Sequence, residues 1–257
     1  MSESSSARVG FGLSTLMFGA ISLVWHDSDL WKHAVLIGGS LAAVLAWGCG
    51  ALLCGGGLML PAGRGRLGAM VLGTGGALLT LSCLADILPA PAGYASYIDF
   101  FELFAIIVGA VAVYAERTPG ELHAGRLRRA AQVAFGCCNI SYAAAQIVFF
   151  SYTASLIPAW IPGATFWTAL TTLAFVLAAV ALLIDRRSRL ALRLLTLMVA
   201  LFALLVWVPR LIAAPTLDNG SELTLTLVIA GAAWTLALVR TGNTVPHDSP
   251  VTRPKAI

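Results

Sequence analysis

The chain has 257 residues, of which 59% are apolar and only 11% are charged. Soluble domains average roughly 45–50% apolar and 25% charged residues, so this composition excludes an ordinary soluble domain and indicates a chain that lies in a membrane. The net charge of +4 is spread over several segments rather than gathered in one basic stripe, and we expect no nucleic-acid partner.

Eight apolar runs follow one another along the chain. Each has about the 17–25 residues that a helix needs to cross a bilayer, and the second run has excess length that tilting can accommodate. Because lipid offers no partners to free backbone groups, these runs are predicted to be helices, and the alternation typical of β-barrel strands does not occur in them. The runs are residues 9–25, 34–60, 67–88, 98–115, 130–150, 164–184, 190–213 and 223–239.

The two halves of the chain resemble each other. The dipeptide Phe11-Gly12 recurs as Phe135-Gly136, 124 residues later, in each case a few residues inside an apolar run. The sequence therefore predicts an all-α polytopic membrane protein of eight transmembrane helices, built as two tandem four-helix bundles. The expected parts are a tail (1–8), the first repeat (9–115), a cytoplasmic linker (116–129), the second repeat (130–240) and a disordered tail (241–257).

The basic residues predict the orientation. All but two of the 16 lysines and arginines fall on one side of the predicted helices, the exceptions being Lys32 and Arg210. Under the positive-inside rule this places both termini in the cytoplasm, most simply of a bacterial inner membrane. No small-residue cleavage pattern follows the first run, so we expect this run to stay in the protein as an anchor.

The five cysteines all fall inside apolar runs, where cysteine behaves as a small hydrophobe. They do not form a C-x-x-C pair, and their odd number argues against complete disulfide pairing. We interpret them as packing residues rather than redox groups, and we expect no metal site. They are Cys49, Cys54, Cys83, Cys137 and Cys138.

Ionisable residues gather at the outward ends of the predicted helices, at one membrane level that we call the outer rim. Inserting a charged side chain into the membrane within a helix costs roughly 2.5–3.5 kcal/mol, so we expect each of these residues to have a structural or functional role. Asp86 and Arg210 are 124 residues apart and opposite in charge, and we expect Arg210 to pair with Asp86 or with Glu222. The alternatives are side chains that only reach the headgroups and a site for a ligand. The rim residues are His26, Asp86, Glu102, Arg210 and Glu222.

A second polar feature lies on the predicted fifth helix. Asn139, Tyr142 and Gln146 are spaced i, i+3 and i+7 and therefore share one face near the middle of the bilayer. Such a face either hydrogen-bonds a neighbouring helix or lines a pocket for a small molecule or a quinone. Both interpretations stay open at this point.

Several segments of the second half resemble the DoxX-like membrane proteins. They are Leu156-Ile157-Pro158-Ala159-Trp160-Ile161-Pro162-Gly163, Phe166-Trp167, residues 185–190, Trp207-Val208-Pro209-Arg210 and Asn219-Gly220-Ser221-Glu222. The resemblance covers residues 130–240 and the first half only in outline. It implies four-helix bundles, and some members are linked to thiosulfate:quinone oxidoreductase or to oxidative-stress complexes. Relatives often carry a histidine where Trp207 stands, so only Pro209, Arg210 and Glu222 are carried over as family positions.

No motif in the chain specifies a reaction. The sequence contains no zinc-protease motif, no phosphate-binding loop and no nucleophile elbow. Three function classes remain: an accessory or scaffold subunit of a membrane complex, a quinone- or lipid-linked oxidoreductase subunit, and a small-molecule transporter. The expected partners are the lipid bilayer and other membrane subunits or further copies of this chain. A quinone is the candidate cofactor.

Overall fold

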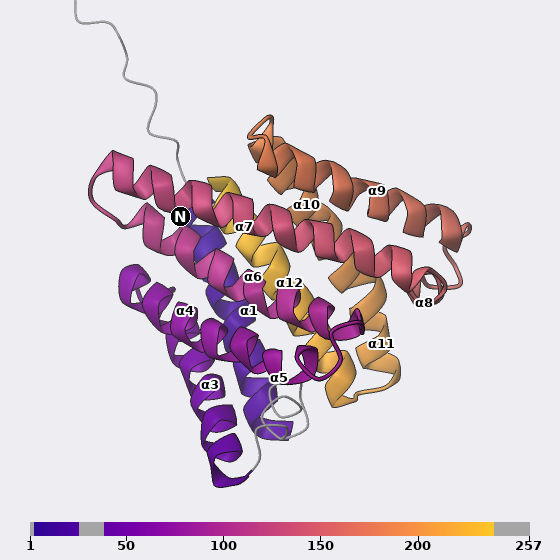
Figure 1. The fold of residues 1–257 in the computed structure, drawn as a ribbon, viewed down its shortest axis with the longest axis horizontal. Helices are drawn as coiled ribbons and strands as arrows, with labels where there is room; N and C mark the ends of the chain where they lie inside the picture. The colour runs from indigo at the N-terminus through magenta and orange to yellow at the C-terminus, as the bar shows by residue number, and fades with distance from the viewer. Residues whose placement is uncertain (1–2, 26–38, 239–257) are drawn as a thin grey trace, which may run out of the picture.

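The structure, a computed structural model, describes residues 3–25 and 39–238, and every regular element in these ranges is a helix (Figure 1). His26 lies outside the described residues. The elements are α1 (Glu3–Trp25), α3 (Gly39–Met59), α4 (Gly65–Ser82), α5 (Leu84–Ile87), α6 (Ala95–Glu116), α7 (Glu121–Val148), α8 (Phe150–Leu156), α9 (Ala164–Leu183), α10 (Ser188–Phe202), the π-helix η1 (Ala203–Trp207), α11 (Val208–Ala213) and α12 (Leu217–Leu238).

Several of these helices are long and apolar enough to cross a membrane, which indicates a multi-pass membrane protein. Six helical segments of the described part meet that condition, and the number rises to seven if α7 and α8, which meet at an angle of 93°, form one span. The apolar helix Ala43–Met59, within α3, is shorter. An all-helical membrane fold is therefore confirmed, whereas the structure yields fewer spans than the eight that the sequence predicts.

Helix boundaries differ from the predicted runs mainly at polar ends. Helix α7 begins at Glu121, so most of the segment 116–129 that the sequence assigns to a linker is the first part of a helix. Gly120, with φ of +89°, precedes it, and Glu121 in the first turn complements the positive end of the helix dipole. Hydropathy detects the apolar part of a helix and misses such a polar extension.

Two helices, α6 and α12, form the centre of the fold. They pack against each other, with α1, α3 and α4 on one side and α7, α9 and α10 on the other (Figure 1). Helix α1 also packs against α12, and α7 packs against α6. The first half of the chain is thus joined to the second along the full central pair.

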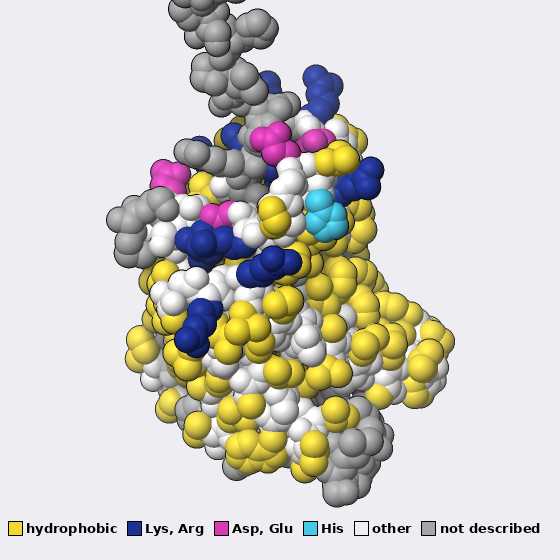
Figure 2. All heavy atoms as spheres, turned by 90° about the vertical axis from the view of Figure 1, so that its left-hand side faces the viewer, with side chains coloured by type: hydrophobic (Ala, Val, Ile, Leu, Met, Phe, Trp, Pro, Cys, Tyr) yellow, Lys and Arg dark blue, Asp and Glu magenta, His cyan; other side chains and the backbone are white. Residues whose placement is uncertain are grey.

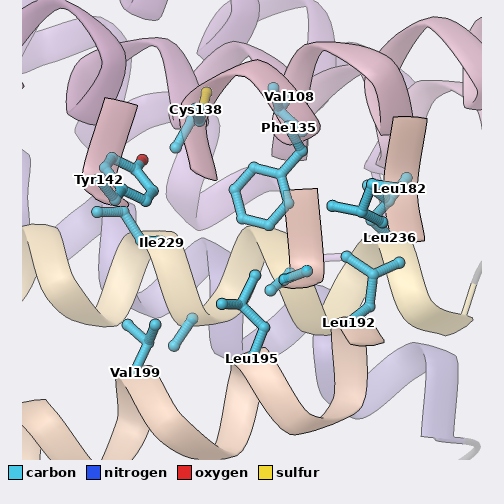
Figure 3. Close-up of a cluster of buried hydrophobic side chains, with 14 of the residues drawn as sticks. Val108, Phe135, Cys138, Tyr142, Leu182, Leu192, Leu195, Val199, Ile229 and Leu236 are labelled. Carbon is cyan, nitrogen blue, oxygen red and sulfur yellow. The ribbon is translucent and has the colours of Figure 1, made fainter. Parts of the chain in front are cut away.

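The central pair divides the interior into two apolar cores. One core surrounds Phe11 of α1 and includes Leu53 of α3 and Leu72 of α4. The other surrounds Phe135 of α7 and includes Leu182 of α9 and Leu195 of α10 (Figure 3). Both phenylalanine side chains are fully buried. Because α6 and α12 contribute side chains to both cores, the stability of each half depends on the same two helices.

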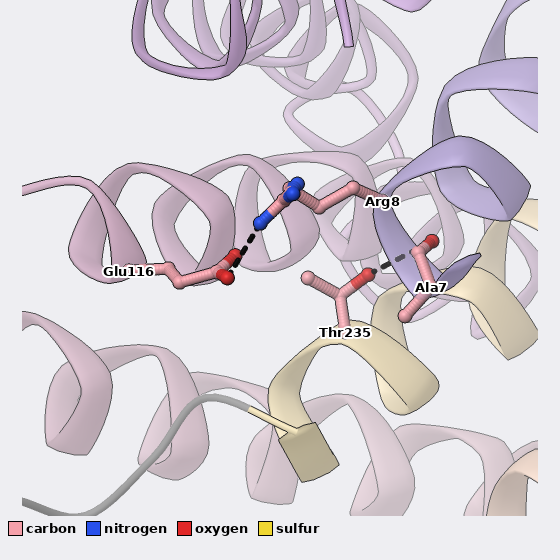
Figure 4. A network of polar contacts seen from close by, with 4 residues as sticks. All are labelled: Ala7, Arg8, Glu116 and Thr235. Carbon is pink, nitrogen blue, oxygen red and sulfur yellow. Dashed lines mark hydrogen bonds and ion pairs between the residues drawn. The ribbon is translucent and has the colours of Figure 1, made fainter. Parts of the chain in front are cut away.

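Polar contacts tie α1 to this central pair near the N-terminal end of α1. Arg8 of α1 forms an ion pair with Glu116 at the end of α6, and the Thr235 hydroxyl of α12 donates a hydrogen bond to the Ala7 carbonyl, 3.4 Å away (Figure 4). The two charged side chains are largely buried, so the pair holds α1 and α6 in a fixed register.

The spans differ in how much of their surface the protein itself covers. In the most apolar 18-residue stretch of each span, the protein buries 72% of the residues of α12, 33% of those of α9 and 22% of those of the span that contains α10. Figure 2 shows basic side chains toward one end of the molecule, above a surface that is largely apolar. Lipid or another apolar molecule is the natural cover for α9 and α10.

Candidate functional site

A large cleft lies on the α9–α10 side of the molecule. Its volume is about 1370 Å³, somewhat larger than the roughly 300–1,000 Å³ of common small-molecule sites. Helices α9 and α10 form its walls, α6, α7 and α12 contribute further residues, and α8 lies at one end. Most of the lining side chains are apolar, among them Phe175, Leu195 and Phe202. The cleft therefore suits an apolar ligand that carries a hydrocarbon chain.

The two ends of the cleft differ in charge. What we call the acidic end carries Glu102 of α6 and Glu222 of α12, together with Asp99. The arginine end carries Arg186 and Arg187, in the turn between α9 and α10. Helix α9 runs from the acidic end to the arginine end, and at 1.5 Å per residue its 20 residues cover about 30 Å, the thickness of a hydrocarbon core.

The cleft brings together four of the predicted site residues. Glu102 and Glu222 come from the rim, and Tyr142 and Gln146 come from the polar face of α7. Residues from both halves of the chain thus meet at one end of one cavity. The other predicted residues that the structure describes, Asp86, Arg210 and Asn139, do not line it, and they are found in α5, α11 and α7.

The polar face of α7 bonds to its neighbours as well as lining the cleft. The Tyr142 hydroxyl donates to the Phe101 carbonyl of α6 at 3.1 Å, and Glu102 lies close enough to interact electrostatically with Tyr142. Asn139 donates from Nδ2 to the Phe135 carbonyl at 2.7 Å, and its buried Oδ1 has no hydrogen-bond partner among the described atoms. Of this face, only Tyr142 and Gln146 reach the cleft.

Gln146 is held by two threonines of α9. Its Oε1 lies 3.2 Å from the Thr171 hydroxyl and 2.8 Å from the Thr172 hydroxyl, and only 9% of the residue is exposed. Thr172 is eight residues into α9, which places this contact about 12 Å from the start of the helix. The sequence shows both threonines as polar breaks in an apolar run, but their partner is visible only in the structure.

Arg210 lies over the ring of Trp207 in the structure. Its guanidinium carbon lies 5.7 Å from the centre of the Trp207 ring. The expected pairing of Arg210 with Asp86 or Glu222 stays a prediction. Arg210 is partly exposed near the end of α11, and its distance to the ring is within the range of a cation–π contact.

A π-helix interrupts the wall that α10 begins. In η1 the Val208 N–H bonds the carbonyl of Ala203, five residues earlier, and Pro209, which follows, has no N–H to offer the preceding turn. Leu205, Val206 and Trp207 of this stretch line the cleft. Short π-helical turns occur often at functional sites. This irregular stretch was not predicted from the sequence, although Pro209 inside an otherwise apolar run is a feature from which it could have been predicted.

The arginine end is built by contacts from α7. Arg129 donates to the carbonyls of Leu182 and Leu183, at 2.8 and 2.6 Å, and so caps the end of α9. Gln132 donates to Asp185 Oδ1 at 2.7 Å, and this hydrogen bond lowers the pKa of the Asp185 carboxyl below its usual value. These bonds fix the turn in which Asp185 adopts a positive φ of 55°.

Within the described ranges, no group of three or more histidine, cysteine, aspartate and glutamate side chains is arranged to hold a metal ion. All five cysteines are free thiols; three are buried, Cys54 is partly buried and Cys137 is exposed. Comparisons of the chain with known protein families, with curated proteins and with solved structures found no match.

Proposed function

We propose that the chain crosses a bacterial inner membrane eight times, as two DoxX-like four-helix repeats with both termini in the cytoplasm. The packing supports the repeat: the first helix of each half, α1 or α7, lies against the last helix of the other half, α12 or α6. The strong bias of the basic residues to one side supports the orientation.

Labelling of single cysteines in intact cells tests this topology. In a cysteine-free background, cysteines placed at Ala92, Ser155 and Thr216 should react with a membrane-impermeant thiol reagent. Cysteines at Ala62 and Thr118 should react only after the cells are opened. Reversed labelling at any of these positions contradicts the proposed topology.

If the native cysteines only pack against neighbouring helices, the cysteine-free protein should bind its ligand as tightly as the unmodified protein does.

The function that the cleft supports best is the binding of a lipophilic quinone, by a subunit of a membrane redox complex. One observation carries this proposal: an apolar cleft beside α9, a helix about as long as a bilayer core is thick, brings Glu102, Glu222, Tyr142 and Gln146 together at one end. An isoprenoid chain fits between α9 and α10, and a polar ring fits among the hydrogen-bonding groups. The resemblance to DoxX-like proteins, some of them linked to quinone chemistry, favours the same ligand class.

Charge favours a neutral head group over a phospholipid at this end. Asp99, Glu102 and Glu222 all line the acidic end, whereas a phosphate is usually bound by arginine or lysine side chains. The basic residues of the lining, Arg186 and Arg187, lie at the other end of α9. A quinone ring carries no charge and offers two oxygens for hydrogen bonds.

Filling the cleft with a large side chain tests the proposal. Ala174 of α9 lines the cleft, so Ala174→Trp should weaken binding of a decyl-substituted benzoquinone at least tenfold because the indole occupies the space of the chain. Binding is measured by quenching of tryptophan fluorescence in lipid nanodiscs.

The matched control is Leu173→Trp, since Leu173 is the preceding residue of α9, is 52% exposed and is not part of the cleft lining. It should bind the quinone as the unmodified protein does. If the unmodified protein does not bind the quinone, or if both variants bind it equally well, the proposed function is wrong.

A further inference from the structure

Four short contacts compete for two protons where Gln146 meets α9. The Thr171 hydroxyl lies 3.2 Å from Gln146 Oε1 and 3.1 Å from the Thr168 carbonyl. The Thr172 hydroxyl lies 2.8 Å from each of the same two oxygens. Since a hydroxyl group has one proton to donate, the two threonines can serve only two of these four contacts as donors at a time.

The same heavy-atom positions therefore satisfy two arrangements of hydrogen bonds. In the first, both hydroxyls donate to Gln146 Oε1, and the amide N–H₂ is left to face the cleft. In the second, both hydroxyls donate to the Thr168 carbonyl, a common bond of threonine in helices, and accept hydrogen bonds from Gln146 Nε2. The amide is then turned by half a rotation, and its oxygen faces the cleft.

In both arrangements, the two threonine hydroxyls and the Gln146 amide atom that faces them form hydrogen bonds. Gln146 is nine-tenths buried and lines the cleft, and its Nε2, as placed, has no hydrogen-bond partner in the described part of the chain. A ligand oxygen that bonds this outward atom adds a hydrogen bond in both arrangements.

We infer that Gln146, Thr171 and Thr172 form an ambivalent head-group site, which donates an N–H to a ligand carbonyl or accepts the O–H of a ligand hydroxyl. The inference rests on the proposed function and specifies it: the cleft binds both the oxidised, carbonyl form and the reduced, hydroxyl form of a quinone. Rotation of an amide and two hydroxyls is a small change, so no movement of the helices is needed to accept either form.

Paired affinities test this inference. In nanodiscs under anaerobic conditions, decyl-benzoquinone and the corresponding quinol should bind the unmodified protein with dissociation constants within about threefold. Gln146→Leu should weaken both forms about tenfold, the effect of one lost hydrogen bond. The carbonyl stretching band of the bound quinone should rise in frequency in this variant, because the N–H donor is gone.

Two further variants separate the site from general packing. Asn139→Leu changes another buried amide on the same face of α7, outside the cleft, and should leave both affinities unchanged. The double change of Thr171 and Thr172 to valine should weaken both forms, and the double change to serine should restore them because serine keeps the hydroxyl groups.

A preference of more than tenfold for one form overturns the inference, as does normal binding of both forms by Gln146→Leu. If Ala174→Trp blocks binding while Gln146→Leu does not, the inference fails and the proposed function stands. If neither form binds the unmodified protein, both fail.

Discussion

Gly57→Ala should lower the free energy of unfolding by about 1–3 kcal/mol, the usual cost of forcing an extra methyl group into a packed interface. A Cβ atom on Gly57 of α3 would lie 2.6 Å from the carbonyl oxygen of Gly12 on α1 and 2.9 Å from the backbone nitrogen of Leu16. Both neighbours are backbone atoms, so the two helices must move apart. Small residues that let helix backbones approach are a main source of helix association in membranes.

A matched control lies two residues away on the same helix. A Cβ atom on Gly55 meets no atom within 4 Å, so Gly55→Ala should be neutral or stabilise the helix by up to about 1 kcal/mol. Unfolding by sodium dodecyl sulfate, followed by tryptophan fluorescence, compares the two variants. Equal stabilities of Gly57→Ala and Gly55→Ala would show that α1 and α3 do not pack as closely as described.

Phe11→Ala should cost about 3 kcal/mol of unfolding free energy, at the lower end of the range for large buried aromatic residues. The lower end is expected because an apolar side chain gains little free energy by moving from lipid into protein. Lost packing contacts therefore make up most of the cost. A Cβ on Gly109 of α6 would lie 2.4 Å from the Phe11 ring, and one on Gly231 of α12 would lie 2.9 Å from the Phe11 backbone. Phe11 is thus enclosed by both central helices.

The same unfolding assay measures this effect. Phe166→Ala removes an aromatic side chain that is 61% exposed and should change the unfolding free energy by less than about 0.5 kcal/mol. Phe135→Ala, in the second core, should cost as much as Phe11→Ala because Phe135 is equally buried. A Phe11→Ala protein as stable as Phe166→Ala would contradict a core shared by α1, α6 and α12.

The sequence predicts an all-helical membrane protein correctly because membrane insertion depends on the mean hydropathy of a run, which is a local property. It predicts eight spans, whereas the described residues contain six candidate spans, or seven if α7 and α8 form one. It also predicts that Tyr142 and Gln146 share a face, because helical spacing is local too. It predicts neither the cleft nor Thr171 and Thr172 as the partners of Gln146. Those features depend on how far α9 stands from α10 and how α9 is rotated against α7, and hydropathy contains no such information.

The contacts of the outer-rim residues also could not be predicted from the sequence. Helix ends place Glu102, Glu222 and Arg210 near one membrane level, but repeat symmetry and short sequence separation do not determine which of them meet. The structure places both glutamates in the cleft and Arg210 over Trp207. The π-helix that carries Trp207 alters the rotation of the residues after it, so the expected geometry of a regular helix does not hold there.

Native mass spectrometry of the protein released from its own membranes tests the central claim, that the α9–α10 cleft holds a quinone, most directly. The unmodified protein and Leu173→Trp should each carry one molecule with the mass of a membrane quinone per chain, and Ala174→Trp should carry none. Phospholipid alone on the unmodified protein, or the same quinone occupancy on Ala174→Trp and Leu173→Trp, would contradict the claim.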